Sequence, residues 1–321
     1  MWRAISTDEV LSTDEVLLQV INLKKYYPIT RGFFHEVVGY VKALDGVSLN
    51  IVKGRVLGIV GESGCGKSTL AKTIVLIEKP TSGRILLKGM DISRASEEGL
   101  KKFRREVQMI FQDPHSSLDP RMRVQELISE ALEIHNIENG ERVEELLYQV
   151  GLKSDVANRF PHELSGGEKQ RVAIARALAV NPEILIADEP LSALDISIQA
   201  QILNLFLELQ EKMGLSLVFI SHDIGTVQLI SEEIAVIYAG KIMESGETET
   251  IFKKPAHPYT QILIDAAKLN LEKIANVSIP PASIGCRFFP RCSQALEICR
   301  QSEPKLRRIN ERQMVACWLY E

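Results

Sequence analysis

Short apolar runs alternate with helical patterns along most of this chain. Four runs have the length and composition of strands buried in a parallel sheet: Val56–Val60, Ile184–Ala187, Leu217–Ile220 and Ile234–Tyr238. Between them, apolar residues recur at helical spacing, as at Val143, Leu146, Leu147 and Val150, and at Ile198, Ile202 and Leu205. Strands that alternate with helices predict an α/β fold with a mostly parallel sheet.

Two stretches depart from this alternation. From about Asp113 to Glu168 strong strand patterns are missing, which predicts a helical insertion. After Lys254 prolines, cysteines and arginines become frequent, which predicts a separate extension. We therefore expect a main domain over residues 1–255, with a helical subdomain at about 113–169, and a smaller extension over residues 256–321. A hexapeptide, STDEVL, occurs twice within Ser6–Leu17, and we interpret it as an inert N-terminal extension because one short duplication makes no solenoid.

Composition excludes several classes of protein. The 321 residues are 45% hydrophobic and 25% charged, as in an ordinary globular protein, and five cysteines are too few for a disulfide framework. The net charge of −4 gives no basic excess, so nucleic acid is not an expected partner. We expect no membrane span, because no apolar stretch is long enough. The acidic N-terminus differs from a secretory signal, which predicts a cytosolic location.

A phosphate-binding loop follows the first of the apolar runs. The sequence GESGCGKST satisfies G-x-x-x-x-G-K-[ST] and lies between an expected strand and an expected helix, which is the context that this motif requires. Glycines allow backbone N–H groups to surround an anion, and the helix N-terminus adds positive potential. We expect Lys67 to contact the β- and γ-phosphates and Ser68 to ligate Mg²⁺. The predicted ATP contacts of the loop are Gly61, Ser63, Gly64, Cys65, Gly66, Lys67, Ser68 and Thr69.

Two acidic residues end the second apolar run. In ILIADE, Asp188 and Glu189 come at the carboxyl end of an expected strand of the same sheet. At this position Asp188 is expected to hold Mg²⁺ through its water shell. Glu189 is expected to orient and deprotonate the attacking water. A solvated strand end is the alternative for an isolated Asp-Glu pair, and the phosphate-loop motif disfavours it.

Between these two motifs lies LSGGEKQR, and with it the chain resembles the ATPase subunits of ABC transporters. The resemblance implies a P-loop NTPase (RecA-like) core with a parallel sheet, an antiparallel β part and a helical ABC subdomain. It also implies a head-to-tail dimer in which each ATP lies between one subunit's phosphate loop and the signature helix of the other. Ser165, Gly166 and Gly167 would then contact ATP across the dimer, with Ser165 as the helix cap.

The remaining landmarks of that family follow in order. Gln112 in MIFQDP matches the glutamine that contacts Mg²⁺ and relays the nucleotide state, and Asp195 in SALD matches a loop that crosses the dimer interface. His222 in VFISHD matches the histidine that contacts the γ-phosphate. Tyr27 resembles the aromatic residue that stacks on adenine, although its neighbour Tyr26 stays an alternative. The resemblance implies Glu189 and His222 as catalytic residues and Ser68, Gln112 and Asp188 around Mg²⁺.

Two segments narrow the resemblance to the branch that serves peptide importers. They are FPHELSGGEKQRVAIARAL and KKPAHPYTQILI, and the second contains His257, Pro258 and Tyr259 at the start of the extension. The branch implies an ATP-hydrolysing subunit of a dipeptide or oligopeptide importer, bound to the cytoplasmic face of the membrane. Its implied partners are a sister ATPase, two transmembrane permease subunits and an extracytoplasmic substrate-binding protein. A nickel importer of the same branch and a soluble ABC ATPase outside transport are the alternatives.

Four of the five cysteines lie in the extension, spaced C-x5-C-x6-C-x17-C: Cys286, Cys292, Cys299 and Cys317. Four thiolates can hold zinc or a [4Fe–4S] cluster, and the absence of close C-x2-4-C pairs favours the cluster over zinc. Extensions of this type in some peptide permease ATPases carry such a cluster, so the resemblance supports the hypothesis. Arg287, Arg291 and Arg300 are expected to offset its negative charge. Four reduced thiols without a metal are the alternative.

Overall fold

The computed structural model describes residues 16–32, 36–268 and 280–321, which form two compact units. The first unit contains the described residues up to Val52, together with Val56–Ser93 and Phe219–Glu321. The second contains Lys53–Arg55 and Arg94–Val218. Most of the duplicated hexapeptide lies outside the described residues.

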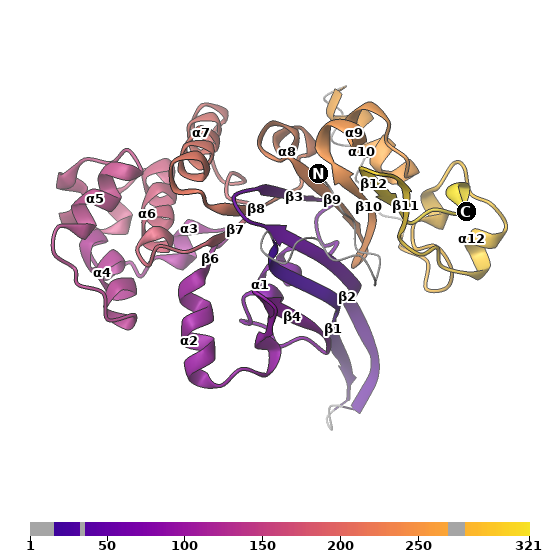
Figure 1. Ribbon diagram of the computed structural model, residues 1–321, viewed down its shortest axis with the longest axis horizontal. Helices are drawn as coiled ribbons and strands as arrows, with labels where there is room; N and C mark the ends of the chain where they lie inside the picture. The colour runs from indigo at the N-terminus through magenta and orange to yellow at the C-terminus, as the bar shows by residue number, and fades with distance from the viewer. Residues whose placement is uncertain (1–15, 33–35, 269–279) are drawn as a thin grey trace. The chain divides into compact units, whose positions relative to one another are not determined.

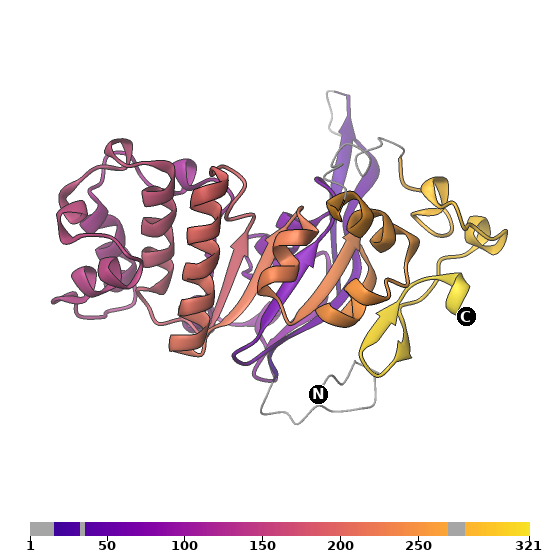
Figure 2. The ribbon, with the colours of Figure 1, turned by 90° about the horizontal axis from the view of Figure 1, so that it is seen from above.

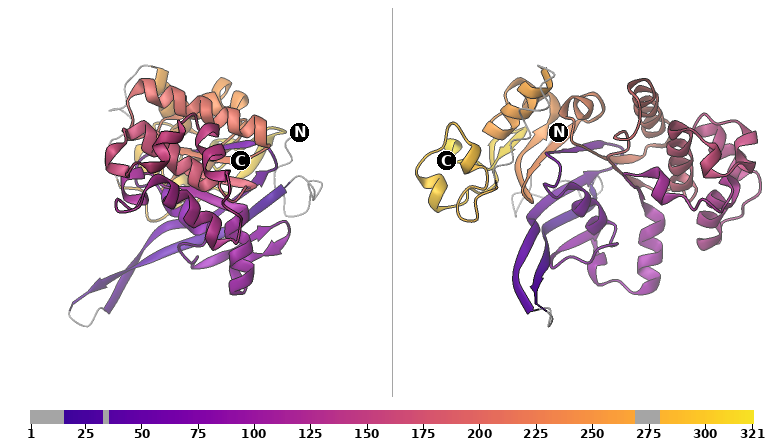
Figure 3. Two further views of the ribbon diagram at one scale, coloured as in Figure 1. Left: turned by 90° about the vertical axis from the view of Figure 1, so that its left-hand side faces the viewer. Right: turned by 180° about the vertical axis from the view of Figure 1, so that it is seen from behind.

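An antiparallel sheet forms the first part of the first unit (Figure 1). Its strand order is β2-β1-β4-β5, with bounds β1 (Val16–Arg31), β2 (Glu36–Val52), β4 (Ser82–Leu87) and β5 (Met90–Asp91). Strand β4 pairs only with the Leu18–Lys24 part of β1, whereas β2 follows β1 as far as Arg31. The far end of this hairpin therefore extends beyond β4, as the left view of Figure 3 shows.

The second sheet of this unit carries the phosphate loop. Strand β3 (Val56–Val60) is buried at every position and pairs parallel with β9 (Glu233–Tyr238). Strand β10 (Lys241–Glu247) is antiparallel to β9 and also pairs with β12 (Gln313–Val315), which in turn pairs with β11 (Arg307–Asn310). The last strands of the chain thus continue the sheet that contains β3. The helices are α1 (Lys67–Ile74), α8 (Ile224–Ile230), α9 (Thr248–Lys253), α10 (Pro258–Lys268) and α12 (Ile298–Gln301).

The second unit is mostly helical, as the magenta and salmon helices of Figure 2 show. Its strands β6 (Val107–Ile110) and β7 (Ile184–Asp188) pair in parallel. Strand β8 (Ser216–Ser221) crosses the boundary between the units in sequence. The helices are α2 (Glu97–Glu106), α3 (Pro114–Ser117), α4 (Val124–Ile134), α5 (Arg142–Gln149), α6 (Gly166–Leu178) and α7 (Ile196–Met213).

The apolar pattern of the sequence located these elements well. The four predicted strands correspond to β3, β7, β8 and β9, and the two helical patterns lie in α5 and α7. Helix α7 begins after Asp195, whose carboxylate accepts from the backbone N–H of Ile198 at 3.0 Å. It ends at Gly214, which has a φ of 62° and so takes the left-handed conformation common after helices. The antiparallel hairpin β1–β2 had no counterpart among the predicted strands.

Candidate functional site: a nucleotide-binding ATPase cassette

The loop between β3 and α1 requires glycine at two positions. A Cβ on Gly61 would lie 2.1 Å from the carbonyl oxygen of Ile237. Gly66 has a φ of 111°, and its Cβ would lie 2.3 Å from the carbonyl oxygen of Ala43. Backbone therefore approaches the loop closely on two sides, which explains the motif glycines by sterics.

Lys67 turns its side chain back into this loop. It begins helix α1, is only 3% exposed, and its Nζ donates to the carbonyl oxygens of Gly61 at 2.8 Å and Glu62 at 3.1 Å. The ammonium group thus lies beside the N-terminus of α1, where positive potential from the helix adds to its own charge. Ser63 and Gly64 are exposed at the tip of the loop. This geometry suits a phosphate group.

Cys65 faces the interior from the same loop. Its side chain is buried, and burial raises the pKa of its thiol to about 11. The thiol is therefore protonated at neutral pH and is a poor nucleophile. Its carbonyl oxygen accepts from the backbone N–H of Gly240 at 2.8 Å, so the residue fixes the loop to the turn after β9.

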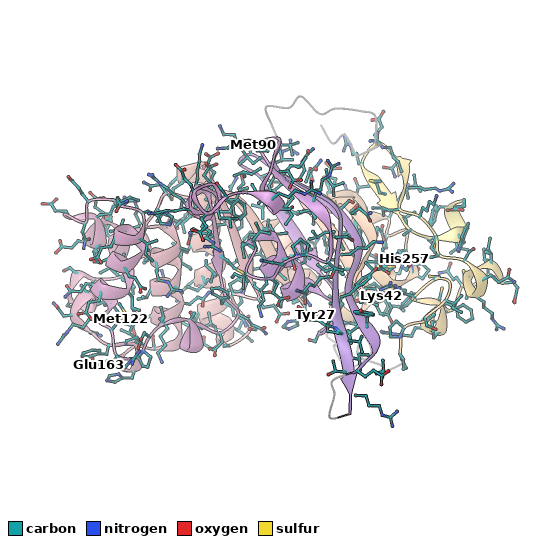
Figure 4. The ribbon with its side chains drawn as sticks, turned by 90° about the horizontal axis from the view of Figure 1, so that it is seen from below. Tyr27, Lys42, Met90, Met122, Glu163 and His257 are labelled. Atoms are coloured by element: carbon teal, nitrogen blue, oxygen red, sulfur yellow. The ribbon has the colours of Figure 1, made fainter. Side chains whose placement is uncertain are left out.

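The two candidate adenine-stacking tyrosines are consecutive residues of β1 with different hydrogen-bond partners; Tyr27 is labelled in Figure 4. Burial raises the pKa of the Tyr27 hydroxyl, and hydrogen bonding with Glu78 adds to the rise. Thr69 of the phosphate loop hydrogen-bonds the same group and lowers that pKa. Tyr26 instead donates to Asp45, and its pKa is raised to about 12 by burial and by that carboxylate. Tyr27 is therefore the tyrosine next to the phosphate loop.

The acidic pair lies in the second unit, at the end of β7. Asp188 and Glu189 are 2% and 8% exposed. Glu189 has a φ of 45°, an uncommon backbone conformation for a residue with a side chain and one found at functional sites. Gln112 follows β6, the neighbour of β7, and its Nε2 donates to Glu189 Oε2 at 3.2 Å. The structure thus joins two residues that the sequence had separated by most of the helical segment.

The signature segment forms a capped helix start, as expected. Ser165 precedes α6, its Oγ accepts from the backbone N–H of Glu168 at 3.3 Å, and the Glu168 carboxylate accepts from the Ser165 N–H at 2.8 Å. This N–H lowers the pKa of Glu168. Gly167 packs tightly, since a Cβ there would lie 2.7 Å from Ile198 Cγ2 of α7. Ser165 is exposed and leaves the first turn of α6 accessible.

Two other predicted residues lie at exposed positions in loops. Asp195 caps α7, and its carboxylate also accepts from Ser197 Oγ at 2.8 Å; the N–H of Ile198 lowers its pKa. His222 follows β8 and is exposed, and the next residue, Asp223, caps α8 with bonds to Gly225 and Thr226. Asp195 therefore has a structural role as a helix cap in addition to its expected functional role, and His222 lies directly before the helix cap Asp223.

Two segments of the chain match family models, one in the predicted main domain and one that covers most of the start of the extension. Residues 44–192 match the model described as ABC transporter. Residues 243–299 match the model described as oligopeptide/dipeptide transporter, C-terminal region. The oligopeptide transport ATP-binding protein AppF of Bacillus subtilis (strain 168) is 46% identical over 96% of this chain and 99% of its own length. The dipeptide transport ATP-binding protein DppF of Escherichia coli (strain K12) is 42% identical over 98% of this chain and 97% of its own.

The chain belongs to the ABC transporter family. This confirms the resemblance drawn from the motifs, and with it the ATPase assignment. Solved ABC cassettes confirm the fold class: the dimeric cassette MJ0796 in a post-hydrolysis state, bound to ADP and Pi, has a TM-score of 0.64 and 30% identity. The likeness covers 72% of this chain and 99% of that one.

The extension of this ABC ATPase contacts the phosphate loop through residues whose contacts sequence reasoning missed. The Tyr259 hydroxyl accepts from the backbone N–H of Glu62 at 2.9 Å. Arg291 forms an ion pair with the Glu62 carboxylate, with an Nη1 to Oε2 distance of 2.7 Å. Arg287 pairs with Asp45. Arg287 and Arg291, which with Arg300 are expected to offset the charge of a metal cluster, thus have carboxylate partners outside the cysteine group. The sequence marked this region by its composition, its cysteines and the motif with His257, Pro258 and Tyr259, but none of these signals indicated a contact with the phosphate loop.

Three of the four extension cysteines, Cys286, Cys292 and Cys317, have thiol pKa values raised chiefly by burial. Burial raises the pKa of the Cys286 thiol to about 11, and Cys299, Cys317 and Cys292 each add to the rise. The backbone N–H of Cys286 also donates to the carbonyl of Cys299 at 2.8 Å. All four are free thiols, and among the described residues no group of three or more His, Cys, Asp or Glu is arranged to hold a metal ion. The described residues therefore present no formed metal ligand set at these cysteines.

Proposed function

We propose that this chain is the ATP-hydrolysing subunit of an importer of dipeptides or oligopeptides. The observation that carries the proposal is its near full-length match to peptide transport ATP-binding proteins, together with the match of residues 243–299 to their C-terminal region. A cassette that shared only the ATPase core with these proteins would lack that second match.

ATP would bind the phosphate loop from Gly61 to Thr69. The position of the Lys67 ammonium inside the loop supports a role for it at the β- and γ-phosphates. Tyr27 is the better candidate for adenine stacking, because it shares a hydrogen bond with Thr69. Mg²⁺ would be held by Ser68, Gln112 and Asp188, and it would supply charge neutralisation for the phosphates.

Hydrolysis would use Glu189 as the group that orients and deprotonates water, with His222 at the γ-phosphate. The Gln112–Glu189 hydrogen bond supports this assignment, because it places an amide against the base and so couples the base to the segment after β6. Phosphoryl transfer depends chiefly on positioning and electrostatics, so a shift of Gln112 would change the orientation of Glu189.

A sister ATPase would complete each site in a head-to-tail dimer. Ser165, Gly166 and Gly167 would present the N-terminus of α6 to the ATP bound by the partner, and Asp195 would lie at the interface. The exposure of Ser165 and Asp195 supports these roles.

Two permease subunits would receive the motion at the cytoplasmic face of the membrane, and an extracytoplasmic protein would deliver the peptide. In the part of the chain that the structure describes, no helix is long and apolar enough to cross a membrane. The second unit has a cavity of about 640 Å³ lined by Ser117–Met122, Leu127, Glu130 and Arg176; Met122 is labelled in Figure 4. This cavity is a suitable dock for a cytoplasmic loop of a permease.

The test of ATP chemistry is Glu189→Gln. This variant keeps the size of the side chain and removes the base, so it should bind ATP, lose hydrolysis by about a hundredfold or more, and accumulate as an ATP-bound dimer. Phosphate release and size-exclusion chromatography with MgATP measure these effects. Turnover at the wild-type rate would contradict the role of Glu189.

The test of cargo is uptake of labelled peptides by cells with and without the gene. Loss of dipeptide or oligopeptide uptake, restored by the wild type but not by Glu189→Gln, is the expected result. Loss of Ni²⁺ uptake with normal peptide uptake would replace peptide with nickel as cargo.

We also propose a [4Fe–4S] cluster for Cys286, Cys292, Cys299 and Cys317, with zinc as the less favoured metal. The effect of neighbouring cysteines on the pKa values of Cys286, Cys292 and Cys317 supports their proximity, whereas the described residues contain no group of three or more ligands arranged for a metal ion. Anaerobic purification with iron, sulfide and zinc analysis tests it. A folded, metal-free protein would leave four structural thiols.

A further inference from the structure

Glu62, inside the phosphate loop, is held from two directions by the extension. Its backbone N–H donates to the Tyr259 hydroxyl at 2.9 Å. Its carboxylate receives both terminal nitrogens of Arg291, at 2.7 Å to Oε2 and 2.8 Å to Oε1. This bidentate arrangement fixes direction as well as distance. The Arg291 side chain is 6% exposed and that of Glu62 17%, so solvent screens the pair little.

The extension side of this contact is closely packed. The Tyr259 ring packs against Tyr238 and Phe288, with centroid distances of 4.9 and 5.3 Å. The Arg291 guanidinium lies over the rings of Tyr238 and Phe288 at 5.7 and 5.6 Å from the centroids. His257 fixes the backbone before the tyrosine, because its Nδ1 accepts from the Tyr259 N–H at 3.0 Å. Packing thus sets where the hydroxyl and the guanidinium lie.

The loop side transmits any shift of Glu62 directly to the phosphate site. The carbonyl oxygen of Glu62 accepts from Lys67 Nζ at 3.1 Å and from the backbone N–H of Cys65 at 3.2 Å. Displacement of Glu62 would therefore move an anchor of Lys67 and the turn of the loop together. We therefore expect such a displacement to change the affinity for nucleotide more than the rate of hydrolysis.

The positive charge of Arg291 also favours the binding of phosphate groups by the loop. A carboxylate beside an anion-binding loop repels phosphates, and the guanidinium of Arg291 compensates it. Removal of one member of a shielded ion pair leaves the other charge without a partner, which is costlier than replacement of both by neutral groups. Arg291 therefore acts on geometry and on the local potential at once.

We propose that Arg291 and Tyr259 are positioning residues of the ATP site, through which the C-terminal extension holds the phosphate loop open to nucleotide. The inference rests on the proposed binding of ATP by this loop. In this proposal the extension contributes residues to the nucleotide site. It is also attached to the sheet through the pairing of β12 with β10.

The experiment compares MgATP binding and steady-state hydrolysis of the purified full chain. Arg291→Ala should raise the Kd and KM for ATP about tenfold while kcat stays within about threefold of wild type. Tyr259→Phe removes only the hydroxyl and should weaken binding about threefold, because one backbone N–H loses its acceptor. Arg312→Ala is the matched control, since Arg312 also pairs with a carboxylate, Glu247, at 3.1 Å, but on the surface. It should bind ATP as wild type does.

A double variant separates positioning from general damage. Arg291→Gln with Glu62→Gln leaves a neutral, hydrogen-bonding pair and should bind ATP within about threefold of wild type. It also decides the question if Arg291→Ala does not fold. Equal Kd values for Arg291→Ala and Arg312→Ala, or a double variant as weak as Arg291→Ala, would overturn the proposal. Lys67→Ala monitors the proposed function separately: if it binds ATP as wild type does, the loop itself is not the site.

Discussion

His257 makes the attachment of the extension sensitive to acid. Its side chain is 1% exposed, and burial alone lowers its pKa from 6.5 to about 3. The ring lies against Phe288, with centroids 5.6 Å apart, and its Nδ1 accepts from the Tyr259 N–H, so only the neutral ring fits. The buried Glu244 carboxylate accepts from the backbone N–H groups of Ala256 and His257 at 2.8 and 2.9 Å, not from the His257 ring.

The pH dependence of the free energy of unfolding follows from the difference between the pKa of His257 in the folded and unfolded states. Because the pKa in the folded state is depressed, the neutral ring contributes stability that is present above pH 6.5 and is lost as the pH falls towards 3. At pH 5 the unfolded chain holds most of this proton and the folded chain almost none, so the loss is about 2 kcal/mol relative to pH 8. Burial raises the pKa of Glu244, whose contribution therefore changes in the opposite direction as the pH falls.

The assay uses the fluorescence of Trp318, which lies in the extension and donates from Nε1 to the carbonyl of Ser302 at 3.0 Å. A Trp2→Phe background leaves it as the single tryptophan. Urea unfolding at pH 8 and pH 5 should give a free-energy difference about 2 kcal/mol smaller in His257→Asn than in the parent, because asparagine keeps an acceptor and does not titrate. His162→Asn, at an exposed site, should keep the parent's difference. An unchanged difference in His257→Asn would refute the reasoning.

Three further predictions concern the nucleotide site. Gly61→Ala places a Cβ 2.1 Å from a backbone carbonyl and should abolish ATP binding in equilibrium dialysis, whereas Gly39→Ala, with 3.8 Å to its nearest atom, should bind normally; binding by both would be inconsistent with the loop geometry. Tyr27→Ala should weaken fluorescent ATP-analogue binding more than Tyr26→Ala, and the reverse order would assign adenine to Tyr26. Gly167→Ala, 2.7 Å from a methyl group of α7, should lower stability by about 1–3 kcal/mol in thermal unfolding, and an unchanged midpoint would argue against tight packing there.

Sequence by itself determined the local elements and the motifs. The strands before the phosphate loop and the acidic pair are short runs of consecutive apolar residues, which is the pattern typical of strands buried in a parallel sheet. The phosphate loop is equally local: its glycines, Lys67 and the following helix are adjacent in the chain. Ser165 as a helix cap followed from residue type and spacing, and the structure confirms it.

Only the tertiary structure decided which distant groups meet. The sequence carries no information on the partner of a single charged side chain. Arg291 is expected from the sequence only to offset the charge of a cluster, and the fold pairs it with the Glu62 carboxylate, 229 residues away. The same reason explains why the Gln112–Glu189 contact, between residues 77 apart in the chain, could not be predicted. The preference for Tyr27 over Tyr26 at the adenine stays a prediction, and the hydrogen bond of Tyr27 with Thr69 supports it. The pairing of β12 with β10 could not be predicted either, because a strand of three residues is too short to show a recognisable apolar pattern. Long-range contacts arise from packing of complete elements, and that packing connects the extension to the phosphate loop.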